Sequence, residues 1–240
     1  MTNSEVFAGA GPARRSTISP HAYPERACRR LEGFSKPLSV LLIIYALVAV
    51  LAGLVSAYGI VDTRMFSEEA IANADIDADS TMIMAAVVFS LLAVLERLVF
   101  FICVFFVGRF TYRAMRNLYT VGSMVPEKSP AGTIYWYVVP FANFVVPASA
   151  MSEIYRGSIE ETGRVHKSNL VGYWWTAWLV SLAAAIVSNS RYTPIDVLGI
   201  AVTISLLFSG LAALLLRVLI QRIAAAQQII MQTGAVQIFA

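Results

Sequence analysis

Long apolar runs separated by short polar segments dominate the pattern of this chain. About 20 apolar residues are needed to cross the hydrocarbon core of a bilayer, and four runs approach or exceed that length: residues 37–60, 82–107, 170–187 and 195–216. Their apolar residues do not follow amphipathic spacing, so the helices they form are apolar on most sides. The pattern therefore predicts an all-α fold, an integral membrane helical bundle with four transmembrane helices.

A fifth apolar segment, residues 131–152, cannot form one continuous helix. Pro140 and Pro147 interrupt it, and Asn143 lies between them. Proline lacks an N–H and clashes with the preceding turn, and in lipid the freed backbone groups need partners from protein or from a wet cavity. We expect this segment to be re-entrant or interfacial, and residues 135–147 to line the structural centre of the bundle.

The distribution of positive charge bears on whether that segment crosses the membrane. If it does not cross, every Lys and Arg lies on one side except Arg64, Arg191 and the intramembrane Arg97. If it crosses, the basic residues divide more evenly between the two sides. The positive-inside rule favours the first arrangement. We therefore expect the N-terminus, the C-terminus and residues 152–169 to be cytoplasmic.

The domain organisation follows from these segments. Residues 1–36 are polar and basic, and their first half has the composition of a disordered segment. Residues 37–233 form the membrane domain, and residues 234–240 form a C-terminal tail.

No cofactor or metal site is predicted. The 2 Cys and 2 His residues show no zinc-type spacing. Three alternating aspartates in the acidic loop 61–81 begin like an EF-hand, but the glycine and the glutamate that the motif requires are missing. The chain also lacks the common hydrolase, zinc-protease and nucleotide-binding motifs. We expect a protein that is not an enzyme.

Glu96 and Arg97 are adjacent charged residues near the middle of the second span. Charge at that depth is costly and normally faces a protein interior or a cavity. Neighbouring helical residues point about 100° apart, so each is expected to have its own partner on another segment. Two interpretations stay open: a structural ion pair that fixes helix rotation, within one chain or across a dimer, and a working site.

The second span is expected to continue beyond the membrane as a helix that carries Arg109, Arg113 and Arg116 on one face. Such a stripe suits anionic lipid headgroups, and it is too short and too close to the membrane to predict a nucleic-acid surface. Two spans also carry small residues every four positions, a pattern that lets another helix approach closely: Ala49, Gly53 and Ala57, and Ala177, Ser181 and Ala185.

Four motifs resemble those of a known family: RFTYRAMRNL (109–118), SPAGTIYWYVVPFANFVVP (129–147), SEIYRGS (152–158) and GYWWTAWLVS (172–181). Together they resemble bacterial membrane proteins grouped as domain of unknown function family 4328. The resemblance covers roughly residues 35–231, and its most specific part is Pro140-Phe141-x-Asn143 with Pro147. It implies a bacterial multi-pass membrane domain and supplies no activity.

Three classes of function are compatible with the sequence. A non-enzymatic module of the bacterial inner membrane, which associates with itself or with a membrane-protein partner, is favoured by the small-residue faces and the basic stripe. A small transporter or channel is the alternative, and it would use the broken segment with Glu96 and Arg97. An intramembrane enzyme with Glu96 as a base is chemically possible, but no motif supports it.

Overall fold

The computed structural model describes residues 30–61, 79–123, 126–135, 144–163 and 168–239, and no strand occurs among them. The long helices are α1 (Glu32–Val61), α3 (Asp79–Thr120), α6 (Leu170–Ser188) and α7 (Ile195–Phe239). Two shorter helices, α4 (Gly132–Tyr135) and α5 (Val146–Glu160), come from the proline-broken segment. The all-α prediction is confirmed.

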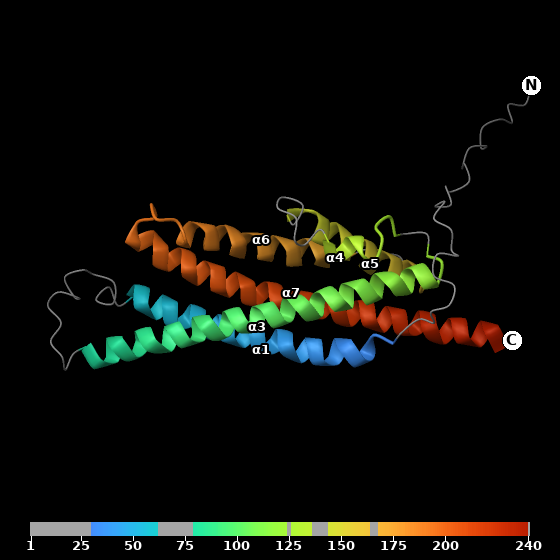
Figure 1. Ribbon diagram of the computed structural model, residues 1–240, viewed down its shortest axis with the longest axis horizontal. Helices are drawn as coiled ribbons and strands as arrows, with labels where there is room; N and C mark the ends of the chain where they lie inside the picture. Colours follow the sequence, from blue (N-terminus) through green and yellow to red (C-terminus); the bar gives the residue numbers. More distant parts are fainter. Residues whose placement is uncertain (1–29, 62–78, 124–125, 136–143, 164–167, 240) are drawn as a thin grey trace, which may run out of the picture.

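The four long helices lie side by side in an elongated bundle (Figure 1). Successive long helices run in opposite directions, so α1 begins, α3 ends, α6 begins and α7 ends at the same end of the bundle. All four are long and apolar enough to cross a membrane. This arrangement confirms the expected bundle of four candidate membrane-spanning helices.

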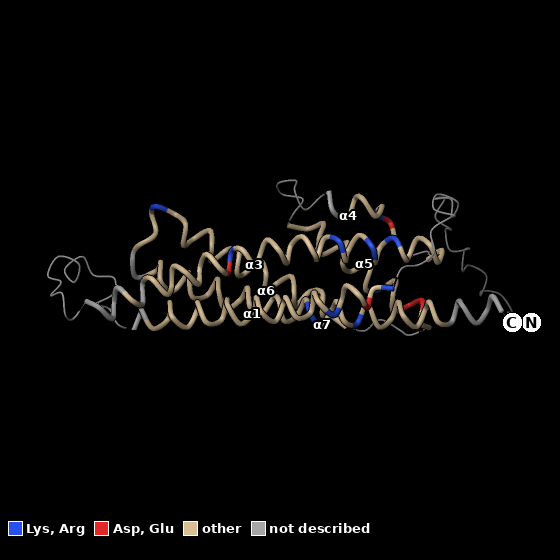
Figure 2. The backbone as a smooth tube through the Cα atoms, turned by 60° about the horizontal axis from the view of Figure 1, so that its bottom comes forward, with Lys and Arg blue, Asp and Glu red and all other residues tan. Residues whose placement is uncertain are grey.

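Two of these helices are much longer than a membrane is thick. At a rise of 1.5 Å per residue, the 42 residues of α3 and the 45 residues of α7 extend about 63 Å and 68 Å. The hydrocarbon core is about 30 Å thick, so both helices continue well beyond it. We call the described residues of 30–36, 109–135, 144–163 and 217–232 the basic end, because Lys and Arg gather there (Figure 2).

Helix α7 occupies the centre of the bundle, where it contacts α1, α3, α5 and α6. It approaches α1 closely at Gly210, where an added Cβ would lie 3.2 Å from Val50 Cγ2 and 3.3 Å from the Ala46 carbonyl oxygen. On α1, Ala49 and Gly53 lie in this same contact. The small-residue face predicted on the first span is therefore used to pack one helix of this chain against another.

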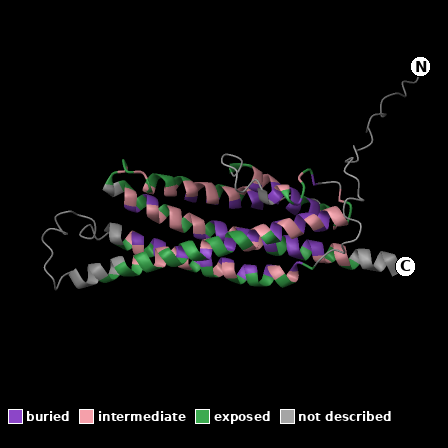
Figure 3. Ribbon diagram, viewed as in Figure 1, coloured by how far each residue is buried: buried purple, intermediate pink, exposed green. Residues whose placement is uncertain are grey.

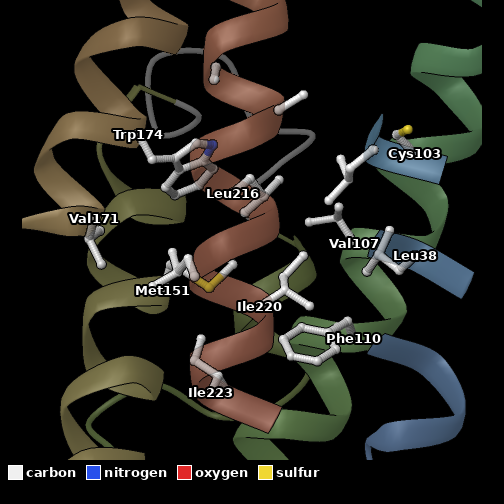
Figure 4. Packing of buried hydrophobic residues seen from close by; sticks show 14 of the residues in the cluster. Leu38, Cys103, Val107, Phe110, Met151, Val171, Trp174, Leu216, Ile220 and Ile223 are labelled. Atoms are coloured by element: carbon white, nitrogen blue, oxygen red, sulfur yellow. The ribbon is translucent and has the colours of Figure 1, made fainter. Parts of the chain in front are cut away.

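The most completely buried side chains gather toward the basic end (Figure 3). In Figure 4, residues of α7 lie between those of α5 and α6 on one side and those of α1 and α3 on the other. Phe110, Met151, Ile220 and Ile223 are almost fully buried there. This part of the molecule has a well-packed core, as a water-soluble helical domain does.

Two described residues next to the break do not line the centre of the bundle. Phe144 and Val145 are 42% and 67% exposed, and α5 packs on α3 and α7 near the basic end. Pro147 is buried in the first turn of α5, where a helix tolerates proline because the first N–H groups have no intrahelical partner. The expectation of a central position is therefore wrong for Phe144 and Val145, whereas Pro147 is buried, and Pro140 and Asn143 lie outside the described residues.

One hydrogen bond shows how far the described part of this segment extends along the bundle. The indole Nε1 of Trp175 donates to the Phe144 carbonyl oxygen at 3.0 Å. Trp175 is five residues into α6, about 8 Å along its axis from Leu170. The described residues on both sides of the segment, 126–135 and 144–163, lie at the basic end, and residues 136–143 lie outside the described residues.

Candidate functional site

Glu96 is buried inside the membrane-spanning part of the bundle, with 4% of its surface exposed. Its Oε1 accepts a hydrogen bond of 2.7 Å from the Tyr45 hydroxyl of α1, and Ser209 of α7 lies beside that hydroxyl. Side chains of three helices therefore meet around the hydrogen bond between Tyr45 and Glu96. An ionisable group at this depth needs such partners, because lipid offers none.

Arg97 lies on the outside of the same helix, and its side chain is 65% exposed. Its Nε is 3.7 Å from Glu96 Oε2, which is longer than a normal hydrogen bond. The expectation that both charges face protein is met by Glu96 and not by Arg97 within one chain. Adjacent helical residues point about 100° apart, so α3, which has one covered face, buries only one of them.

The three arginines predicted to face headgroups lie on the part of α3 that follows its most apolar stretch, near the basic end. The guanidinium carbons of Arg113 and Arg109 lie 4.0 Å and 5.8 Å from the centre of the Phe34 ring. Such cation–π contacts join α3 to the first turn of α1. Arg109 is exposed, whereas Arg113 and Arg116 are half-buried, and their contact with headgroups stays a prediction.

A buried amide joins three helices at the basic end. Gln227 of α7 is 2% exposed, and its Nε2 donates to the Ala114 carbonyl oxygen at 2.9 Å and to Ser158 Oγ at 3.1 Å. Its Oε1 accepts a hydrogen bond of 2.9 Å from Asn117 Nδ2. We call these four residues the Gln227 junction. Each buried polar group in it gains a protein partner.

A second polar contact fixes the chain between α3 and α5. Glu153 Oε2 accepts hydrogen bonds from the backbone N–H groups of Glu127 at 3.2 Å and Lys128 at 3.3 Å, and Glu153 Oε1 forms an ion pair with Lys128 Nζ. Lys128 Nζ also donates to Ser149 Oγ at 2.8 Å. The Tyr119 hydroxyl of α3 donates to the Lys128 carbonyl oxygen at 3.0 Å. The segment before α4 is thereby attached to two helices.

Sequence reasoning missed both polar contacts at the basic end. The available signal was the position of Asn117, Glu153 and Ser158 in or beside the family-like motifs, together with Gln227 in a mostly apolar helical stretch. Neither contact has the composition of a metal site. Among the described residues, no group of three or more His, Cys, Asp or Glu side chains could hold a metal ion.

The fold and these contacts define a class of protein, a multi-pass helical membrane protein with a packed end outside its apolar spans. The sequence profile of a family described as "Domain of unknown function (DUF4328)" matches residues 67–228. This match covers more than half of the chain, so the chain belongs to that family. No curated protein and no solved structure matches it. The family match includes Glu96, Arg97 and the whole Gln227 junction.

Proposed function

We propose that this protein is a non-enzymatic module of the bacterial cytoplasmic membrane that assembles with itself or with a membrane-protein partner. Its partners in this proposal are the lipid bilayer and one or more protein chains. Family membership and four apolar helices support the membrane assignment. The polar contacts at the basic end support a structural role, because they join segments of this chain to one another.

The observation that carries the proposal is Arg97. It lies in the middle of an apolar span, its side chain is 65% exposed on the surface of the single chain, and large apolar side chains surround it on α3. A charged side chain facing lipid at mid-membrane costs about 3 kcal/mol or more. A protein surface that supplies an acceptor removes that cost, so α3 is the helix that most needs a partner.

The orientation in the proposal follows from charge. The described Lys and Arg residues at the basic end are Arg30, Lys36, Arg109, Arg113, Arg116, Lys128, Arg156, Arg217 and Arg222. At the opposite end the described basic residue is Arg191 (Figure 2). Cytoplasmic loops carry the excess of Lys and Arg, so the basic end is assigned to the cytoplasm.

The transporter alternative rests on the same pair of charges. The buried carboxylate of Glu96 is the observation that favours it, because such groups often mark ion or substrate paths. The hydrogen bond from Tyr45 at 2.7 Å gives that carboxylate a structural partner and favours the assembly proposal.

The mass of the purified complex tests the proposal. After extraction in a mild detergent, native mass spectrometry should give either a multiple of the 26.2 kDa chain or that chain with another protein. The proposal is contradicted if the protein, at a concentration like that in its own membrane, remains a lone 26.2 kDa chain with only lipid and detergent bound.

A further inference from the structure

Two buried polar atoms on α1 and α7 have no hydrogen-bond partner in the described part of the chain. Ser39 of α1 is 6% exposed, and its Oγ is one of these atoms. The other is the Nε of Arg217 on α7. Buried polar groups in folded proteins are almost always hydrogen-bonded, so each of these atoms needs a partner beyond the described residues.

The packing of the two helices places Ser39 and Arg217 at the same level. An added Cβ at Gly210 would lie 3.3 Å from the Ala46 carbonyl oxygen, so Gly210 and Ala46 face each other. The helices run in opposite directions. Seven residues back from Ala46 and seven residues on from Gly210 lead to Ser39 and Arg217. Seven residues are about two helical turns, so both residues return to the facing sides of their helices.

The residues that precede these two in the sequence support this placement. Leu38 and Leu216 are both buried and belong to one packed cluster. In that cluster Leu38 lies at a level between Leu216 and Ile220 (Figure 4). The unpaired atoms of Ser39 and Arg217 therefore belong to one place between α1 and α7.

This place lies where the apolar spans meet the basic end. Arg217 directly follows the apolar run 195–216, and Ser39 is the third residue of the run 37–60. Lys36 is exposed and lies three residues before Ser39, on the same side of α1. Neither Arg217 nor Lys36 forms an ion pair with another described residue. Two cations without a described carboxylate partner thus lie at the depth of lipid headgroups.

We propose that this place between α1 and α7 binds the phosphate of an anionic phospholipid, with the Arg217 guanidinium and the Ser39 hydroxyl as donors and Lys36 at its rim. A guanidinium matches the oxygens of a phosphate group, and basic pockets between spans on the cytoplasmic side suit such headgroups. Exposed side chains of both helices, such as Leu47 and Leu214, leave apolar surface for the acyl chains. The inference rests on the membrane placement in the proposed function and not on assembly with another protein.

A carboxylate of the same chain is the rival partner for Arg217. Glu32 lies seven residues before Ser39, on the same side of α1, but about 10 Å further from the apolar span. It forms no ion pair with another described residue. The rival predicts that Glu32→Gln and Arg217→Gln lower the melting temperature alike in detergent without lipid, whereas the lipid site predicts that neither does.

Native mass spectrometry of the purified protein in mild detergent tests the site. The protein is titrated with phosphatidylglycerol, and with phosphatidylethanolamine of the same acyl chains as the reference. Arg217→Gln should weaken binding of the first phosphatidylglycerol about tenfold, because a hydrogen bond to a charged group is lost. Ser39→Ala should weaken it about threefold, because the hydroxyl supplies one bond and no charge. The matched control is Arg156→Gln, which removes an exposed cation paired with Glu160 at the same end and should leave the affinity unchanged.

Equal affinity for the two lipids, or an equal loss in Arg156→Gln and Arg217→Gln, would overturn the inference, because the charge of the whole basic end would then attract the lipid. Displacement of the lipid by inorganic phosphate would also overturn it and assign the site to a soluble anion. A lone chain that retains phosphatidylglycerol supports the inference and contradicts the proposed assembly. A protein complex without lipid preference overturns the inference and leaves that assembly standing.

Discussion

At the scale of single residues, one amide at the basic end has an unusually complete set of partners. Gln227 uses both ends of its side chain, donating to Ala114 and Ser158 and accepting from Asn117. Its three partners come from two other helices. Removing such a group takes one hydrogen bond from each of its partners, and the loss of a partner by a buried polar group costs more than the bond itself contributes.

The substitution Gln227→Leu should therefore lower the free energy of unfolding by about 1–3 kcal/mol. The neighbouring Gln228→Leu is the matched control, because Gln228 is half-exposed and outside the Gln227 junction. Thermal unfolding of both variants in the same detergent measures the difference. Equal melting temperatures would show that the junction does not stabilise the fold.

The residues that form these contacts show that the pairing of distant segments could not be predicted from the sequence. Asn117 and Gln227 are 110 positions apart, and an apolar pattern does not indicate which segments meet. The same limit applied to Glu96 and Arg97. Because α3 is apolar on most sides within the membrane, the pattern did not indicate which of the two charges would face the protein interior.

At the scale of helices, α1 and α7 approach each other closely. An added Cβ at Gly210 would lie 3.3 Å from the Ala46 carbonyl oxygen, a backbone atom that moves only with its helix. The lengths of the apolar runs predicted both helices, since helix formation across lipid is a local property. The prolines at 140 and 147 predicted an interrupted segment, but not that its described helix α5 packs on α3 and α7.

Comparing Gly210→Ala with Gly108→Ala should isolate the packing between α1 and α7. Both substitutions gain similar helix propensity, but a Cβ at Gly108 meets nothing within 4 Å. Gly210→Ala should therefore be less stable than Gly108→Ala by about 1–3 kcal/mol, the usual cost of overpacking. Unfolding in increasing SDS measures the two stabilities. Equal stabilities would mean that α1 and α7 make room for the added Cβ without a loss of stability.

At the scale of the whole molecule, two exposed loops lie at opposite ends of the bundle. Glu161 follows α5 at the basic end, and Tyr192, which is 85% exposed, lies between α6 and α7 at the other end. If the basic end is cytoplasmic, Tyr192→Cys should react with a membrane-impermeant maleimide in cells whose outer membrane has been opened. Glu161→Cys should react only after the inner membrane is also broken.

Both variants need a background without Cys28 and Cys103, so that labelling reports the introduced thiol. The reverse pattern would contradict the proposed orientation. Labelling of both positions in cells with an intact inner membrane would contradict the separation of the two loops by the bilayer.

The length of α3 and α7 has a mechanical consequence. Both helices pass from the apolar spans into the basic end as continuous helices (Figure 1) and without a proline, one of the usual causes of a sharp kink. Each helix therefore acts as a lever whose two arms tilt together. We therefore expect a protein or lipid that pulls on the basic end to tilt the apolar span of α3, and a change in bilayer thickness that tilts the spans to move the Gln227 junction.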